Sequence, residues 1–213
     1  MARRNRTQPN PKPERVESKP VGPRLFIAAS LPNPVLDHLG HLLDDLSNRN
    51  LPVRWTAPNA LHLTLHFIGE VPVERAELLR MSFSNFSPKI GPIKLRTSKL
   101  GAFPSQKRPR VLWIGLDGQT RLLEDRHTET ATLLERLGVQ LEDRTFRPHL
   151  TLGRARDSVD QLFPYQLQEA YSATSVQEIV THPVDFTISD LTLFRSHLEK
   201  SGARYEPLAT VRL

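Results

Sequence analysis

The sequence predicts an α+β protein built from two similar lobes. Three observations support this fold class. Strand-like and helix-like segments interleave along the chain, the same coarse order of segments occurs in each half, and the tetrapeptide His-Leu-Thr-Leu occurs once in each half, at residues 62–65 and 149–152. A chain of 213 residues is long enough for one domain or for two small lobes that share a core.

The first half is expected to hold a strand, a helix, a short strand, a longer strand and a second helix. The helix follows Asn33, a suitable N-cap, and Pro34, a suitable first helical residue, and its leucines recur at helical spacing. The strands are apolar and β-compatible. The expected ranges are 24–31, 34–48, 53–56, 61–69 and 74–82.

The second half repeats this outline. Two strands are joined by a loop that carries proline and arginine, and a helix then ends before Gly138, which suits the residue after a helix. A strand, a helix entered by the turn 157–160, and two closing strands follow. The expected ranges are 93–103, 110–116, 122–137, 148–154, 162–171, 184–194 and 204–213.

Composition narrows the class of protein. The chain is 38% hydrophobic and 24% charged, which excludes collagen-like and wholly disordered classes. It contains no Cys, which excludes disulfides, thiolate metal sites and cysteine nucleophiles. No apolar run approaches the roughly 20 residues of a membrane-spanning helix, and the N-terminal segment lacks the apolar stretch of a secretory signal. We therefore expect a cytoplasmic protein.

The charge is concentrated at the N-terminus. Residues 1–24 carry seven Lys or Arg against two acids, so they hold +5 of the net charge of +6. Five prolines and few large apolar residues predict that residues 1–23 form a disordered basic arm ahead of a single domain at 24–213. The arm could be idle, or it could be attracted weakly to RNA.

The repeated tetrapeptide predicts a site between the lobes. Alternate residues of a strand point to the same face, so His62 shares a face with Thr64, and His149 with Thr151. If a pseudo-twofold axis relates the halves, two imidazoles and two hydroxyls converge on one cleft. Two imidazoles suit acid–base catalysis near neutral pH, and threonine hydroxyls can donate hydrogen bonds to phosphate oxygens.

Other interpretations of these histidines stay open. Either one alone could be an ordinary polar residue of a half-buried strand. His62, His66 and His149 could also bind zinc, but no carboxylate motif lies at a suitable spacing. We therefore expect no metal and no cofactor, and we expect His66 to face solvent or the edge of the cleft.

The motifs and their surroundings resemble the 2H phosphoesterases, which carry two His-x-Thr-x motifs. The resemblance is greatest to the RNA 2′,3′-cyclic phosphodiesterases historically called LigT or 2′–5′ RNA ligase proteins, and it covers about residues 24–213. The matching stretches are RLFIAASLP (24–32), VRWTAPNALHLTLHFIGEV (53–71), FPSQKRPRVLWIGL (103–116), FRPHLTLGRAR (146–156) and RYEPLATVRL (204–213).

This resemblance implies two pseudo-twofold-related lobes, each with an antiparallel sheet backed by helices. It implies metal-independent hydrolysis of a ribose 2′,3′-cyclic phosphate to a 2′-phosphomonoester. By analogy, His149 is the base that accepts a proton from water, and His62 is the acid that protonates the leaving 3′ oxygen. Thr64, Thr151 and Arg154 are expected to bind phosphate.

Arg154 extends the second motif to His-x-Thr-x-x-Arg, whereas the first motif has Phe67 at the equivalent place. In a regular strand Arg154 has the opposite parity to His149. Its participation therefore requires a bulge or the end of the strand, which Gly153 could provide. Otherwise Arg154 is an exposed residue at a strand end.

Phe26, Phe103 and Arg110 are further candidate substrate contacts. The aromatic residues could belong to the core or could stack on an RNA base. Arg110 shares a loop with Lys107 and Arg108, which could be solvated or could contact RNA beyond the terminal nucleotide.

We expect RNA 3′ ends or small cyclic nucleotides as ligands of a monomer that needs no membrane and no obligatory protein partner. The same acid–base pair could serve a 2′–5′ RNA ligase or a 2′–5′ linkage phosphodiesterase. An alternative of another class is a non-catalytic module that binds RNA ends.

Overall fold

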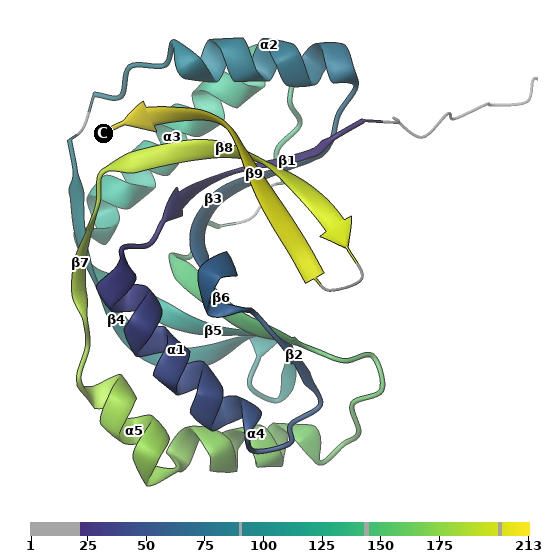
Figure 1. Cartoon of the computed structure of the whole chain (residues 1–213), viewed down its shortest axis with the longest axis vertical. Coiled ribbons are helices and arrows are strands. Elements are labelled where there is room, and N and C mark those ends of the chain that lie inside the picture. Colours follow the sequence, from purple (N-terminus) through teal and green to yellow (C-terminus); the bar gives the residue numbers. More distant parts are fainter. Residues whose placement is uncertain (1–21, 90, 143–144, 200–201) are drawn as a thin grey trace, which may run out of the picture.

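One curled sheet organises the chain (Figure 1). In the computed structural model, which describes residues 22–89, 91–142, 145–199 and 202–213, the strand order is β7-β4-β5-β6-β3-β1-β8-β9, and β2 pairs with β6. The recorded strand pairs are all antiparallel. The strands are β1 (Arg24–Ser30), β2 (Val53–Trp55), β3 (His62–Glu70), β4 (Ile93–Ser105), β5 (Arg108–Gly118), β6 (His149–Ala155), β7 (Asp185–Ile188), β8 (Asp190–Glu199) and β9 (Gly202–Arg212).

The helices back the two ends of this sheet. Figure 1 shows α2 and α3 at one end of the molecule and α1, α4 and α5 at the other. In the described ranges the helices are α1 (Asn33–Ser47), the 3₁₀ helix η1 (Pro58–Ala60), α2 (Val73–Ser84), α3 (Thr120–Arg136), α4 (Phe163–Ser172) and α5 (Thr174–Thr181). α1 follows β1 in the chain but packs against α5, and α3 follows β5 and contacts both β3 and β4. Each of these helices therefore contacts an element from the other half of the chain.

A single recorded residue pair joins the two halves of the sheet. Leu63 of β3 lies opposite Leu150 of β6, and both side chains are 0% exposed in the core. β3, β1, β8 and β9 lie on one side of this junction, and β6, β5, β4 and β7 lie on the other. The expected α+β architecture of two lobes is confirmed.

Two differences from the sequence prediction concern helices. Asn33 is not the N-cap of α1, because the Pro32 carbonyl already accepts the backbone N–H groups of Val35 and Leu36. α5 was not predicted at all. Its sequence, Thr-Ser-Val-Gln-Glu-Ile-Val-Thr, is rich in β-branched residues of low helix propensity, and burial of Val176 and packing against α1 override that preference.

Two further differences concern strands. The predicted strand 184–194 divides at Ser189, because β7 pairs with β4 of one lobe whereas β8 pairs with β1 of the other. The predicted loop after residue 103 is only a turn at Gln106 and Lys107, and Pro104 and Pro109 lie opposite each other in β4 and β5. The first boundary depends on which strand each segment pairs with, and at the second the polar residues of 104–108 continue the strands of a hairpin instead of forming a loop.

Residues 1–21 lie outside the described residues, so the basic arm and its boundary at residue 23 stay predictions. Among the helices of the described ranges, none combines the length and the apolar character that a membrane crossing requires.

Candidate active site

The junction of the lobes brings the two motifs onto one face of the sheet. Because Leu63 and Leu150 point into the core, the residues that flank them point to the opposite face, which we call the open face. His62 and Thr64 lie there on β3, and His149 and Thr151 lie there on β6, all half-buried. In an antiparallel pair, diagonal neighbours such as His62 and His149 are roughly 7–8 Å apart.

The two imidazoles are held in the same way. Nδ1 of His62 lies 2.8 Å from the carbonyl oxygen of Ala60, and Nδ1 of His149 lies 2.6 Å from that of Arg147. A carbonyl oxygen can only accept, so each Nδ1 carries a hydrogen and donates it. Each neutral ring therefore has its lone pair on Nε2, which is the atom left to exchange a proton with a ligand.

Aromatic rings pack beside both histidines. The rings of Phe26 and Tyr205 each lie 5.0 Å from that of His62, and Tyr205 meets it edge-on. Phe103 lies 5.0 Å from His149, also edge-on, and Trp113 lies 6.3 Å away. These contacts limit rotation of each imidazole and remove water from one side of it.

Burial and charge lower the pKa of both imidazoles. Desolvation is the main cause at His62, and it is partly offset by the Ala60 carbonyl and reinforced by the nearby His149. Desolvation is also the main cause at His149, and it is partly offset by the Arg147 carbonyl and reinforced by the positive charge of Arg154. Near neutral pH both rings therefore favour the neutral form in the free protein.

The threonine hydroxyls are available beside the imidazoles. Within the described part of the chain, no hydrogen bond is recorded from the Thr64 or the Thr151 hydroxyl. An anion placed between the motifs could accept a hydrogen bond from each.

A bulge in each strand brings the second residue after the motif, Phe67 or Arg154, to the open face. In β3 the register against β1 shifts at Leu65, and in β6 the register against β5 shifts at Leu152. The bulge in β6 restores Arg154 to the face of His149. Burial raises the pKa of Tyr205, the ring that packs on His62, and the charge of Arg154 partly offsets that rise, so Arg154 lies close to both motifs. The bulge expected near Gly153 is therefore present one residue earlier.

The bulge in β3 has a different chemical result. It places Phe67 on the open face with 62% of its surface exposed and its ring 6.3 Å from Phe26. In the sequence, Phe67 stands out only as the counterpart of Arg154. Tyr205 lies in the closing stretch 204–213 that resembles the family, and this position was the one sequence signal that could have identified it.

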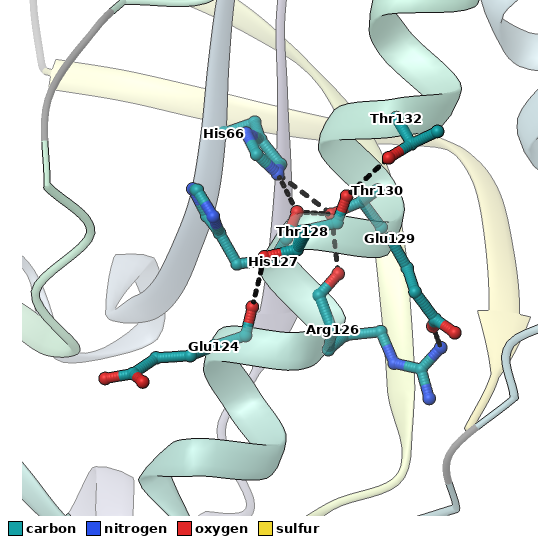
Figure 2. Close-up of polar contacts among 8 residues, drawn as sticks. All are labelled: His66, Glu124, Arg126, His127, Thr128, Glu129, Thr130 and Thr132. Atoms are coloured by element: carbon teal, nitrogen blue, oxygen red, sulfur yellow. Dashed lines mark hydrogen bonds and ion pairs between the residues drawn. The ribbon is translucent and has the colours of Figure 1, made fainter.

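The bulge also corrects the expectation for His66, which is 5% exposed and points into the core (Figure 2). Its Nε2 lies 2.8 Å from the Thr130 hydroxyl and 2.9 Å from the carbonyl oxygen of His127 on α3, and its ring stacks on that of His127. Nε2–H donates to these oxygens, and burial lowers the pKa of His66 to about 4. His66 cannot join a zinc site with His62, because the two lie on opposite faces.

The remaining candidates differ in exposure. Phe26 is 3% exposed, which leaves little surface for a ligand and favours a role as support for His62. Phe103 is half-buried against His149. Arg110 is exposed and precedes Val111, the residue of β5 that lies opposite Arg154.

Comparison with known proteins adds independent findings. The family model described as LigT like Phosphoesterase matches residues 30–113 and again 114–205, so each match contains one motif. The RNA 2′,3′-cyclic phosphodiesterase of Archaeoglobus fulgidus is 30% identical over 188 residues, which cover 87% of this chain and 97% of the relative. That of Geobacillus stearothermophilus is 29% identical over 189 residues, which cover 88% of this chain but only 56% of the relative, so the chain spans about half of that protein.

The fold also matches a solved structure. The crystal structure of E. coli LigT complexed with 3′-AMP superimposes with a TM-score of 0.66 at 25% sequence identity, and the match covers 90% of this chain and 98% of that chain.

Proposed function

The chain belongs to the LigT-like phosphoesterase family, and we propose that it hydrolyses the 2′,3′-cyclic phosphate at an RNA end to a 2′-phosphomonoester. The observation that carries this proposal is the pair of imidazoles on neighbouring strands, each with Nδ1–H bonded to a carbonyl and Nε2 left for catalysis. A cyclic phosphodiester bound between them meets a base on one side of phosphorus and an acid on the other.

The reaction uses one proton acceptor and one proton donor. His149 Nε2 accepts a proton from water as the water oxygen attacks phosphorus, and the bond from phosphorus to the 3′ oxygen breaks. Protonated His62 donates its Nε2–H to that oxygen, so the product carries a 3′ hydroxyl and a 2′ phosphate. The positive charge of Arg154 favours neutral His149, which supports the assignment of His149 as the base.

Thr64, Thr151 and Arg154 bind the non-bridging oxygens in this proposal. Their donors lie on the same face as the imidazoles, and a guanidinium stabilises the charge that develops on the phosphoryl group. Exposed Phe67 offers a surface on which the terminal base could stack.

The test is turnover by the pure full chain in EDTA. A nucleoside 2′,3′-cyclic phosphate and an oligoribonucleotide with the same end should both give the 2′-phosphate, identified by phosphorus NMR. His62→Ala and His149→Ala should each lower kcat by about 10²–10⁴-fold while the circular dichroism spectrum stays that of the wild type. A 3′-phosphate product would contradict the assigned leaving group. Binding without turnover would favour the RNA-end-binding alternative.

A further inference from the structure

Two arginines lie directly opposite each other beside the candidate active site. Arg54 of the short strand β2 pairs in register with Arg154 of β6. A Cβ added to Gly153 would lie 2.7 Å from the Val53 side chain and 3.0 Å from that of Trp55, so these neighbours of Arg54 point to the core side. By strand alternation, Arg54 points to the open face together with Arg154.

This pair of cations has no acidic partner among the described residues. Two other exposed arginines of the sheet are paired, Arg24 with Glu70 and Arg96 with Asp185, whereas Arg108 and Arg110 of β5 have no recorded acidic partner within the described ranges. No such ion pair is recorded for Arg54 or Arg154, although both are exposed. Like charges directly opposite each other destabilise an antiparallel pair. An arrangement that costs stability and leaves two guanidinium groups open is suited to an anionic ligand.

The backbone holds Arg54 firmly in this place. The Thr56 N–H donates to the Leu152 carbonyl oxygen at 2.8 Å, and the Arg156 N–H donates to the Pro52 carbonyl oxygen at 2.8 Å, so β2 is bonded to β6 beyond both of its ends. β5 occupies one edge of β6, so β2 lies on the other edge, which also carries β3, and Arg54 flanks Arg154 on that edge.

We propose that Arg54 binds a second phosphate of the substrate, the one on the 5′ side of the terminal nucleotide, so that the site recognises an RNA chain and not only its cyclic end. This inference rests on the proposed function, in which Arg154 binds the terminal phosphate. Neighbouring β-strands lie about 4.7–4.9 Å apart, and long arginine side chains on two such β-strands can bind two successive phosphates of one RNA chain. The RNA then leaves the site across β2.

The experiment compares two product-like ligands. A short oligoribonucleotide that ends in a 2′-phosphate has the second phosphate, and the nucleoside 2′-monophosphate lacks it. Affinities for both are measured for the wild type, Arg54→Ala, Arg54→Lys and, as a matched control, Arg121→Ala, which removes an exposed arginine at the start of α3.

Arg54→Ala should weaken oligonucleotide binding about 10-fold more than mononucleotide binding, the effect of losing a charge-assisted hydrogen bond. The slope of log K against log salt for the oligonucleotide should fall by about 0.7, the value for one phosphate contact with a single strand. Arg54→Lys should lie between the wild type and Arg54→Ala, because it keeps the charge but not the planar fork. Arg121→Ala should match the wild type with both ligands.

Two results would overturn the inference. Equal losses for both ligands would place Arg54 at the terminal phosphate, and unchanged oligonucleotide affinity would remove it from the site. Thermal unfolding checks that Arg54→Ala is folded; if it is not, the Arg54→Lys comparison decides. Wild-type turnover of cyclic ends is measured in parallel. Its absence would refute the proposed function, whereas the binding comparison would still decide the role of Arg54.

Discussion

His62 and His149 occupy equivalent positions in the two lobes, and each donates Nδ1–H to the carbonyl oxygen of the residue two places earlier in the chain. The equivalence is not complete. The positive charge of Arg154 contributes to the lowered pKa of His149, whereas the ring of Tyr205 packs edge-on against His62. One architecture thus presents two similar imidazoles to a ligand in different electrostatic surroundings.

The pH dependence of the reaction should be bell-shaped, with the optimum of kcat/KM below pH 6.5. His149 must be neutral and His62 protonated, and burial lowers the pKa of both below their ordinary value of 6.5. Bound anionic substrate favours protonated His62, so the alkaline limb of kcat should lie at higher pH than that of kcat/KM. A rate that does not change from pH 5 to 9 would contradict two titrating imidazoles.

Loss of the phosphate ligands should weaken anion binding. Thr64→Val and Thr151→Val keep the shape of the side chain but remove the hydroxyl donor, and each should lower affinity for a nucleoside 2′-phosphate by a few-fold. Arg154→Ala should cost about 10-fold or more, because its hydrogen bond is charge-assisted. Calorimetric titration measures these losses. A crystal structure with the anion bound away from both motifs would refute the placement.

Gly101→Ala should disturb the second motif. A Cβ at Gly101 would clash with the Trp113 indole, which packs on Phe103 beside His149. Overpacking of this kind costs about 1–3 kcal/mol, so we expect a lower Tm, altered tryptophan fluorescence and a lower kcat. Gly40→Ala is the matched control. Gly40 lies in α1, and a Cβ there would contact only the Pro58 side chain, at 3.9 Å, so this substitution should raise the free energy of unfolding by about 0.5–1 kcal/mol.

Stability should fall in acid partly because of His66. Its pKa of about 4 in the folded protein lies below its ordinary value of 6.5, so the unfolded chain binds the proton more readily. The folded state is therefore penalised as pH falls from 6.5 toward 4, by up to about 3 kcal/mol. Urea unfolding between pH 7.5 and 4.5 should show a smaller loss for His66→Gln than for the wild type. Gln replacing exposed His41 is the control, and an identical loss in both variants would contradict this prediction.

Deletion of residues 1–23 should leave kcat on a cyclic mononucleotide unchanged, because the predicted arm lies outside the motifs. If the arm contacts RNA, deletion should also weaken oligonucleotide binding and flatten its salt dependence, because fewer counterions are released. Affinities measured with and without the arm at several salt concentrations decide this. A fall in mononucleotide kcat would show that the domain begins earlier than residue 24.

Local pattern was sufficient for most of the secondary structure and for placing the two His-x-Thr motifs on strands. Alternation and helical spacing located β1, β3, β6, α1 and α3 to within a few residues, because each of these elements buries one regular face. The repeated motif predicted that His62 shares a face with Thr64 and His149 with Thr151, because strand parity is a local property. The sequence patterns predicted neither α5 nor the break between β7 and β8, because packing and pairing with distant segments determine both.

Sequence alone determined that this is an α+β protein of two lobes with two His-x-Thr motifs, because periodicity and repetition are encoded in neighbouring residues. Only the tertiary structure decided which side chains accompany those motifs. The bulges at Leu65 and Leu152 turn His66 into the core and Arg154 onto the open face. The register of β2 against β6 sets Arg54 beside Arg154 across a sequence separation that no local pattern spans. Both depend on how strands pair, and pairing is a property of contacts between distant segments.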